Sequence, residues 1–164
     1  MNAGSTANAN STDSRPFDIE SPLVNLDAER SVIGSILLDP DMIDEVADSV
    51  RSDDFYDDKN RRLFQTLLDM RTLGYSVDLT LLVERLRKNC ELEEVGGEAY
   101  LAELMTAVPV SAHARHYAQI VKDRSDRRAL RSAGESIVED AAALDVSTKD
   151  AISRGEARIF AIND

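Results

Sequence analysis

Apolar residues recur every three or four positions along most of this chain, which is the spacing of one face of an α-helix. Between residues 25 and 110 these repeats come in short runs separated by capping residues and glycines. The pattern predicts five short helices packed into a bundle. The residues expected to face inward are Leu26, Ile33, Ile36, Leu37, Met42, Ile43, Val46, Val50, Leu63, Phe64, Leu67, Leu68, Met70, Leu79, Leu82, Val83, Leu86, Tyr100, Leu101, Leu104 and Met105.

Residues with special backbone roles mark the expected helix ends. Asn25 and Asp78 carry side-chain oxygens that accept hydrogen bonds from the free N–H groups of a first helical turn. Gly74 suits the left-handed turn that follows a helix, and the pair Gly96-Gly97 permits a tight change of direction. These positions separate the short helices that are predicted to form the bundle in residues 23–110.

The last third of the chain has a different pattern. Residues 112–144 contain no proline and one glycine, Gly134, and at 1.5 Å per residue they predict a single rod of roughly 50 Å. Ser147 followed by Asp150 resembles a capping box that opens a final helix. Residues 111–164 therefore predict an antiparallel helical hairpin. Its apolar stripes are Tyr117, Val121, Leu130, Ala133, Ile137, Ala141 and Leu144 on the first helix, and Ile152, Gly155, Ile159 and Ile162 on the second.

A rod of this length extends past a bundle of short helices, so part of its apolar stripe needs a partner. Two interpretations are open. In one, the hairpin folds back onto its own bundle. In the other, two subunits pair through their hairpins, and replacing Ile137 by Asp is expected to dissolve the oligomer. The candidate residues for this contact between subunits are Leu130, Ala133, Ile137, Ala141, Ile152, Gly155 and Ile159.

Composition narrows the possible functions. Residues 1–22 are rich in Ala, Asn, Ser and Thr, and we expect them to form a flexible polar tail. The chain has 31 acidic residues against 19 Lys and Arg, a formal charge of −12, which argues against direct binding of nucleic acid by this domain. It has one cysteine and neither an export signal nor a long apolar run, so the expected location is the cytoplasm and no membrane contact is expected.

The chemistry of an enzyme is missing from the sequence. No Gly-Lys pair occurs, so there is no phosphate loop, and no nucleophile elbow is present. No catalytic, cofactor-binding or metal-binding residue is therefore expected in this chain. The basic residues concentrate at Lys122, Arg124, Arg127, Arg128 and Arg131. This cluster is either a solvated face with internal ion pairs or a surface that docks a partner.

Five blocks of the sequence, taken in order, carry a family resemblance. They are Asn25–Gly34 (NLDAERSVIG), Asp54-Phe55-Tyr56, Val77-Asp78-Leu79, Val95-Gly96-Gly97 with Tyr100-Leu101 and Leu104, and Tyr117-Ala118 with Ile120-Val121. In order and spacing these blocks resemble the N-terminal domain of bacterial replicative DNA helicases of the DnaB type, over roughly residues 23–163. One departure is Asn60, where many relatives carry histidine.

The resemblance implies an all-α domain followed by a helical hairpin that pairs subunits, with six chains in a ring. It also implies a separate C-terminal RecA-like ATPase, so that ATP and Mg²⁺ belong to the parent helicase and DNA passes through the parent ring. Primase is the implied partner, with Arg124, Arg127 and Arg128 as candidate docking residues, and a helicase loader is a further possible partner. An isolated fragment and a truncated gene both fit a chain that stops near the linker, and a free-standing regulator without a motor is the alternative function.

Overall fold

The computed structural model describes residues 23–108 and 113–162, and these are helical with no strand. The prediction of an all-α fold is confirmed. The elements are α1 (Leu26–Leu38), α2 (Met42–Ala47), the 3-10 turn η2 (Ser52–Asp54), α3 (Asp58–Thr72), α4 (Leu79–Lys88), α5 (Gly97–Thr106), α6 (Ala114–Ala142) and α7 (Thr148–Phe160). The predicted tail, residues 1–22, lies outside the described residues.

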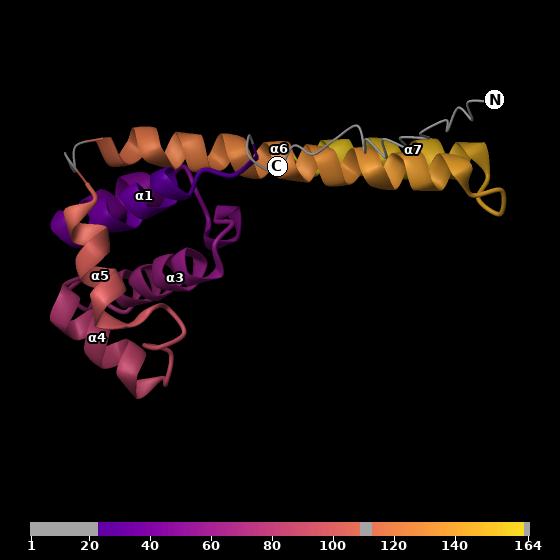
Figure 1. Cartoon of the computed structure of the whole chain (residues 1–164). Helices are drawn as coiled ribbons and strands as arrows, with labels where there is room; N and C mark the ends of the chain where they lie inside the picture. The colour runs from indigo at the N-terminus through magenta and orange to yellow at the C-terminus, as the bar shows by residue number, and fades with distance from the viewer. Residues whose placement is uncertain (1–22, 109–112, 163–164) are drawn as a thin grey trace, which may run out of the picture.

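Helix α1 lies at the centre of the bundle, packed between α5 and α6 (Figure 1). The run from Ala28 to Leu37 is almost wholly buried, so α1 has neighbours on more than the one face that its periodicity predicts. At Gly34 the backbone of α5 comes so close that a Cβ atom would lie 2.3 Å from the carbonyl oxygen of Leu104. Glycine at this position therefore sets the distance between α1 and α5.

The predicted caps are present. The Asn25 side chain accepts a hydrogen bond from the backbone N–H of Ala28 at 2.9 Å, and Asp78 accepts one from Leu81 at 2.9 Å. Gly74 follows α3 with a φ of +75°, the left-handed conformation expected there. Short-range sequence signals thus fixed these helix ends correctly, because each depends on a few neighbouring residues.

A buried carboxylate ties α1 to the start of α3. Glu29, only 2 % exposed, accepts hydrogen bonds from the backbone N–H groups of Tyr56 at 2.7 Å and Asp57 at 3.2 Å. The amide of Asn60 donates a third bond to Glu29 at 3.1 Å and accepts one from the Tyr100 hydroxyl at 2.8 Å. The network satisfies a charge that would otherwise be costly to bury, and it joins α1, α3 and α5.

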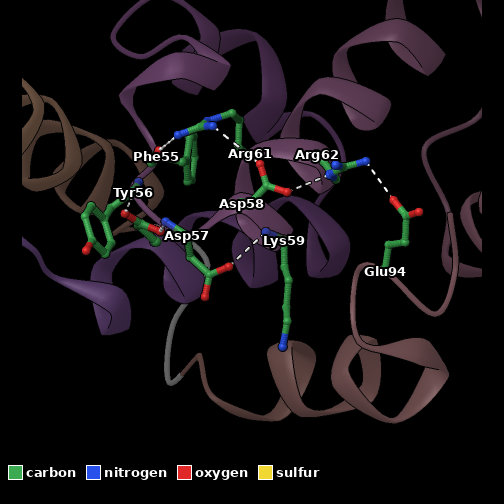
Figure 2. A network of polar contacts seen from close by, with 9 residues as sticks. Phe55, Tyr56, Asp57, Asp58, Lys59, Arg61, Arg62 and Glu94 are labelled. Atoms are coloured by element: carbon green, nitrogen blue, oxygen red, sulfur yellow. Dashed lines mark hydrogen bonds and ion pairs between the residues drawn. The ribbon is translucent and has the colours of Figure 1, made fainter.

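Exposed hydrogen bonds and ion pairs surround the first turns of α3 (Figure 2). Asp57 caps the helix by accepting a hydrogen bond from the backbone N–H of Lys59 at 2.8 Å. Arg62 pairs with Asp58 at 2.7 Å and with Glu94, in the segment before α5, at 2.8 Å. Because these pairs are solvent-exposed, each adds little stability, and their main effect is to orient the Glu94 segment on α3.

The two C-terminal helices form the predicted antiparallel hairpin (Figure 1). The first half of α6 packs on α1, where Ala114, Ala118 and Val121 enter the core. The second half extends beyond the bundle and packs against α7 (Figure 1). The predicted stripe on α6 therefore serves two purposes: its first part closes the bundle and its second part belongs to the projecting hairpin. The predicted domain boundary at residue 110 stays a prediction.

Candidate subunit and partner interface

Large apolar side chains stay exposed along the projecting hairpin. Leu130 is 53 % exposed, Val138 70 % and Ile152 58 %. Leu144, Ile159 and Phe160 are exposed as well. A helical hairpin this apolar on its outer surface is typical of a contact with another protein. We call these six residues the hairpin surface.

The residues predicted for a contact between subunits fall into two groups. Leu130, Ala141, Ile152 and Ile159 are exposed. Ala133 and Gly155 are buried by the chain itself, and Ile137 is partly buried, with its side chain against Gly155. The second group therefore holds the hairpin together. Whether the first group contacts another subunit stays a prediction.

The predicted contact between subunits left out three members of the hairpin surface: Leu144, which was placed in the apolar stripe only, and Val138 and Phe160, which were not predicted at all. Val138 follows Ile137 directly, so it lies beside the predicted stripe on α6. Phe160 is the last residue of α7. Both are apolar and large, and a wider apolar face than a single heptad stripe would have included Val138.

An ion pair fixes the hairpin helices relative to each other. Asp140 of α6, whose side chain is 15 % exposed, pairs with Arg158 and with Arg154 of α7, the latter at 3.6 Å. The hydrogen bond from Arg158 and the positive charges of both arginines lower the pKa of Asp140 below its ordinary value. Beside this pair lies a groove of about 420 Å³, lined mostly by apolar residues near the turn of the hairpin, among them Ile137, Leu144 and Ile152.

Arg128, one of the three predicted docking residues, holds the chain's own structure. Its guanidinium group donates to the carbonyl oxygens of Leu23 at 3.0 Å and Asp54 at 2.6 Å, and it lies 5.6 Å from the ring centroid of Tyr56. It thereby connects α6 to η2 and to the segment before α1. Two of its five N–H donors are engaged on these carbonyl groups, so moving the side chain onto a partner would break both hydrogen bonds.

The other two predicted docking residues lie on the surface of α6. Arg124 pairs with Asp123 at 3.2 Å, and Arg127 pairs with the same carboxylate at 3.0 Å. Lys122 lies between Asp54, at 3.4 Å, and Asp126, at 3.0 Å. The internal ion pairs weighed in the sequence analysis are therefore present. Arg127 nevertheless keeps 58 % of its side chain exposed, so a partner can reach it.

The described residues contain neither a cluster of metal-binding side chains nor a membrane-spanning helix. Within residues 23–108 and 113–162, no group of three or more histidine, cysteine or carboxylate side chains is placed to hold a metal ion. None of the helices in the described part of the chain is long and apolar enough to cross a membrane.

Comparisons with curated proteins agree on one group of relatives. The chain is 38 % identical over 120 residues to the replicative DNA helicase DnaB of Treponema pallidum, an alignment that covers 73 % of this chain and 27 % of that protein. It is 36 % identical over 144 residues to the replicative DNA helicase DnaB of Pasteurella multocida, covering 87 % of this chain and 31 % of the relative. The chain therefore spans less than a third of the length of these relatives.

Solved structures and a family model match the same group of proteins. The N-terminal domain of DnaB helicase from Mycobacterium tuberculosis superimposes with a TM-score of 0.79 at 31 % identity, covering 85 % of this chain and 99 % of that one. A DnaB-like replicative helicase, studied with its interactions with primase, gives a TM-score of 0.70 at 27 % identity, covering 84 % of this chain and 31 % of that one. The model of the DnaB-like helicase N-terminal domain matches residues 21–123, and the chain therefore belongs to this family.

Proposed function

We propose that this chain forms the N-terminal collar of a DnaB-type replicative helicase, in which hairpins from two chains pair and such pairs build a hexameric ring. The observation that carries the proposal is the hairpin surface, with Val138 and Ile152 more than half exposed on helices that project from the bundle. Burying these side chains against a second hairpin removes apolar area from water, the main driving force of association.

The proposal includes a division of labour within the parent protein, which the family resemblance implies. This chain has no phosphate loop. As the resemblance to DnaB-type helicases implies, ATP and Mg²⁺ would be bound by a RecA-like domain of the parent helicase. The net charge of −12 disfavours DNA contact by the collar itself, and DNA would pass through the parent ring. In this proposal the collar acts in the cytoplasm as an assembly and docking module, to which a helicase loader could also bind.

Light scattering on the purified chain over a concentration series tests the pairing. We expect the mass of a dimer or a hexamer, and we expect Ile152→Asp to give a monomer, because a charge would be buried without a partner. Ile152 is a better site than Ile137, since Ile137 contacts Gly155 of its own chain and its replacement disturbs the hairpin itself.

The matched control is Leu73→Asp, which places the same charge on an apolar residue that is 61 % exposed at the end of α3. This variant should keep the mass of the parent chain. A monomeric parent chain at high concentration contradicts pairing by this domain, as does an Ile152→Asp variant that keeps its full mass.

We also propose that the collar docks primase, the interaction studied for the similar DnaB-like replicative helicase. The best candidates on this chain are Arg124 and Arg127, which share Asp123 on the surface of α6. Arg128 is the least suitable of the three predicted residues as a docking group, because its guanidinium group already binds Leu23 and Asp54.

Titration of the chain with purified primase of the same organism tests this second role. We expect Arg124→Glu combined with Arg127→Glu to weaken binding roughly tenfold or more, because two cations become anions at the contact. Replacing Lys149 and Arg115 by Glu gives the same change in net charge at other exposed positions and should leave binding within about twofold. Equal weakening by both double variants contradicts docking at Arg124 and Arg127.

A further inference from the structure

A groove lies between the end of α3 and α4. Helix α4 lies at the end of the bundle away from the projecting hairpin (Figure 1). The groove has a volume of about 470 Å³, and its walls are formed by Met70, Tyr75, Leu81, Glu84, Arg85, Arg87 and Lys88. Tyr75 is 56 % exposed and Leu81 42 % exposed, so the apolar part of the groove is open to solvent. Helix α4 packs mainly on α3.

The outer face of α4 combines apolar and basic side chains. Leu81, Arg85 and Lys88 follow one another at spacings of four and three residues, which puts them on one face, while Leu82 and Leu86 are buried on another. The Arg85 guanidinium lies 5.8 Å from the ring centroid of Tyr75, so the cation and the aromatic ring form a single platform.

Three cations line this groove, and two of them, Arg85 and Lys88, pair with no carboxylate among the described residues. Among the described residues neither Arg85 nor Lys88 makes an ion pair, whereas Arg87 pairs with both Glu84 and Glu98. Cations at the C-terminal end of a helix are favoured by its dipole, which accounts for their presence. The dipole does not account for an exposed tyrosine and leucine next to them in a chain with a net charge of −12.

We infer that the α3–α4 groove docks an acidic, amphipathic segment of a partner protein. Apolar side chains of that segment would cover Tyr75 and Leu81, and its carboxylates would pair with Arg85 and Lys88. Charge complementarity selects this occupant, because three cations and one carboxylate line the groove, and that carboxylate, Glu84, is already paired with Arg87. The groove is separate from the hairpin surface, so this inference does not depend on the proposed pairing or on primase docking.

The single cysteine provides a reporter for the test. Cys90 is exposed and lies two residues beyond Lys88, so an environment-sensitive dye attached to it would sit at the edge of the groove. The labelled full chain is titrated with a synthetic probe peptide that repeats Asp-Asp-Leu-Phe, and with a second peptide that has Lys in place of Asp. We expect a saturable change of emission with the acidic probe that weakens as salt is added, and no saturation with the basic probe.

Matched variants locate the binding. Lys88→Glu should weaken binding of the acidic probe roughly three- to tenfold, whereas Lys149→Glu, the same change at an exposed lysine of α7, should not. Tyr75→Ala should weaken binding as well, with unchanged circular dichroism showing that the bundle is intact.

Three results would overturn the inference. The first is equal binding of the acidic and basic probes, and the second is equal binding by the Lys88→Glu and Lys149→Glu variants. The third is a change of emission caused by adding unlabelled chain alone and abolished by Lys88→Glu, which would make a second copy the occupant. Loss of oligomerisation in Ile152→Asp leaves this titration unaffected, so the two proposals fail separately.

Discussion

Gly155 of α7 presents bare backbone to the side chain of Ile137 on α6: a Cβ atom added at Gly155 would lie 3.3 Å from Ile137 Cγ1. That separation is shorter than an ordinary contact between carbon atoms, so any larger residue must push the isoleucine aside. Glycine therefore sets the distance between the two hairpin helices. Gly155, predicted from the sequence to lie in a contact between subunits, serves here a contact within a single chain.

We expect Gly155→Leu to separate the hairpin helices and to lower the free energy of unfolding by about 1–3 kcal/mol, the usual cost of inserting carbon atoms into a packed contact. The matched control is Gly134→Ala on α6, where an added Cβ meets no atom within 4 Å. That variant should gain about 0.5–1 kcal/mol from helix propensity. Urea unfolding followed by circular dichroism measures both. Equal stability of the two variants would contradict the tight contact at Gly155.

Gly34→Ala is expected to be among the most damaging single-methyl substitutions in the bundle. The added Cβ would lie 2.3 Å from the Leu104 carbonyl oxygen and 2.5 Å from Val108 Cγ2, and a backbone carbonyl cannot move aside as a flexible side chain can. We expect a loss of about 2 kcal/mol or more, despite alanine's higher helix propensity. The midpoint of urea unfolding measures this loss of stability. A midpoint at or above that of the parent chain would refute the close approach of α1 and α5.

Glu29→Ala should destabilise the bundle by about 2–4 kcal/mol, because the backbone N–H groups of Tyr56 and Asp57 would lose their acceptor inside the protein. Asp27→Ala is the control, since Asp27 lies in the same first turn of α1 with its side chain 96 % exposed. It should change stability by less than about 0.5 kcal/mol. Thermal unfolding of both variants measures the contrast, and similar losses would mean that Glu29 acts only through the helix dipole.

These examples show which features the sequence could predict. The caps at Asn25 and Asp78 were predictable because each depends on a few neighbouring residues. The hairpin was predictable because apolar residues repeat at helical spacing over a long stretch without a break. The buried role of Glu29 was not, because a glutamate in a first helical turn looks the same in sequence whether it faces water or the backbone of another segment. The anchoring role of Arg128 was missed for the same reason, since Leu23 and Asp54 are far from it along the chain.

The ion pairs of Asp140 with Arg154 and Arg158 make the stability of the hairpin depend on pH, and the direction of this dependence can be stated. Because Arg158 and Arg154 lower the pKa of Asp140 in the folded chain, the pair stabilises the hairpin above the ordinary aspartate pKa of about 3.9. This contribution is lost as the pH falls from that value through the lowered pKa of the folded state. Asp140→Asn should remove it.

Helicity of the hairpin, followed by nuclear magnetic resonance between neutral pH and about pH 2, tests this dependence. The parent chain should lose hairpin stability in the acid range, and Asp140→Asn should be less stable at neutral pH but change less on acidification. Glu139→Gln is the control, since it removes a neighbouring carboxylate of α6 that makes no ion pair among the described residues. A parent chain and an Asp140→Asn variant with parallel acid profiles would contradict a role for this pair.

Adjacent arginines on α6 should respond differently to the same substitution. Arg128→Lys keeps the charge but loses the fork that donates to both Leu23 and Asp54, so we expect a loss of about 1–2 kcal/mol in unfolding free energy. Arg127→Lys keeps an exposed pair with Asp123 and should change stability by less than about 0.5 kcal/mol. Urea unfolding of both variants decides between anchoring and surface roles. If Arg128→Lys proved as stable as Arg127→Lys, the contacts of Arg128 would not hold α6 to the bundle, and Arg128 would return to the set of candidates for primase docking.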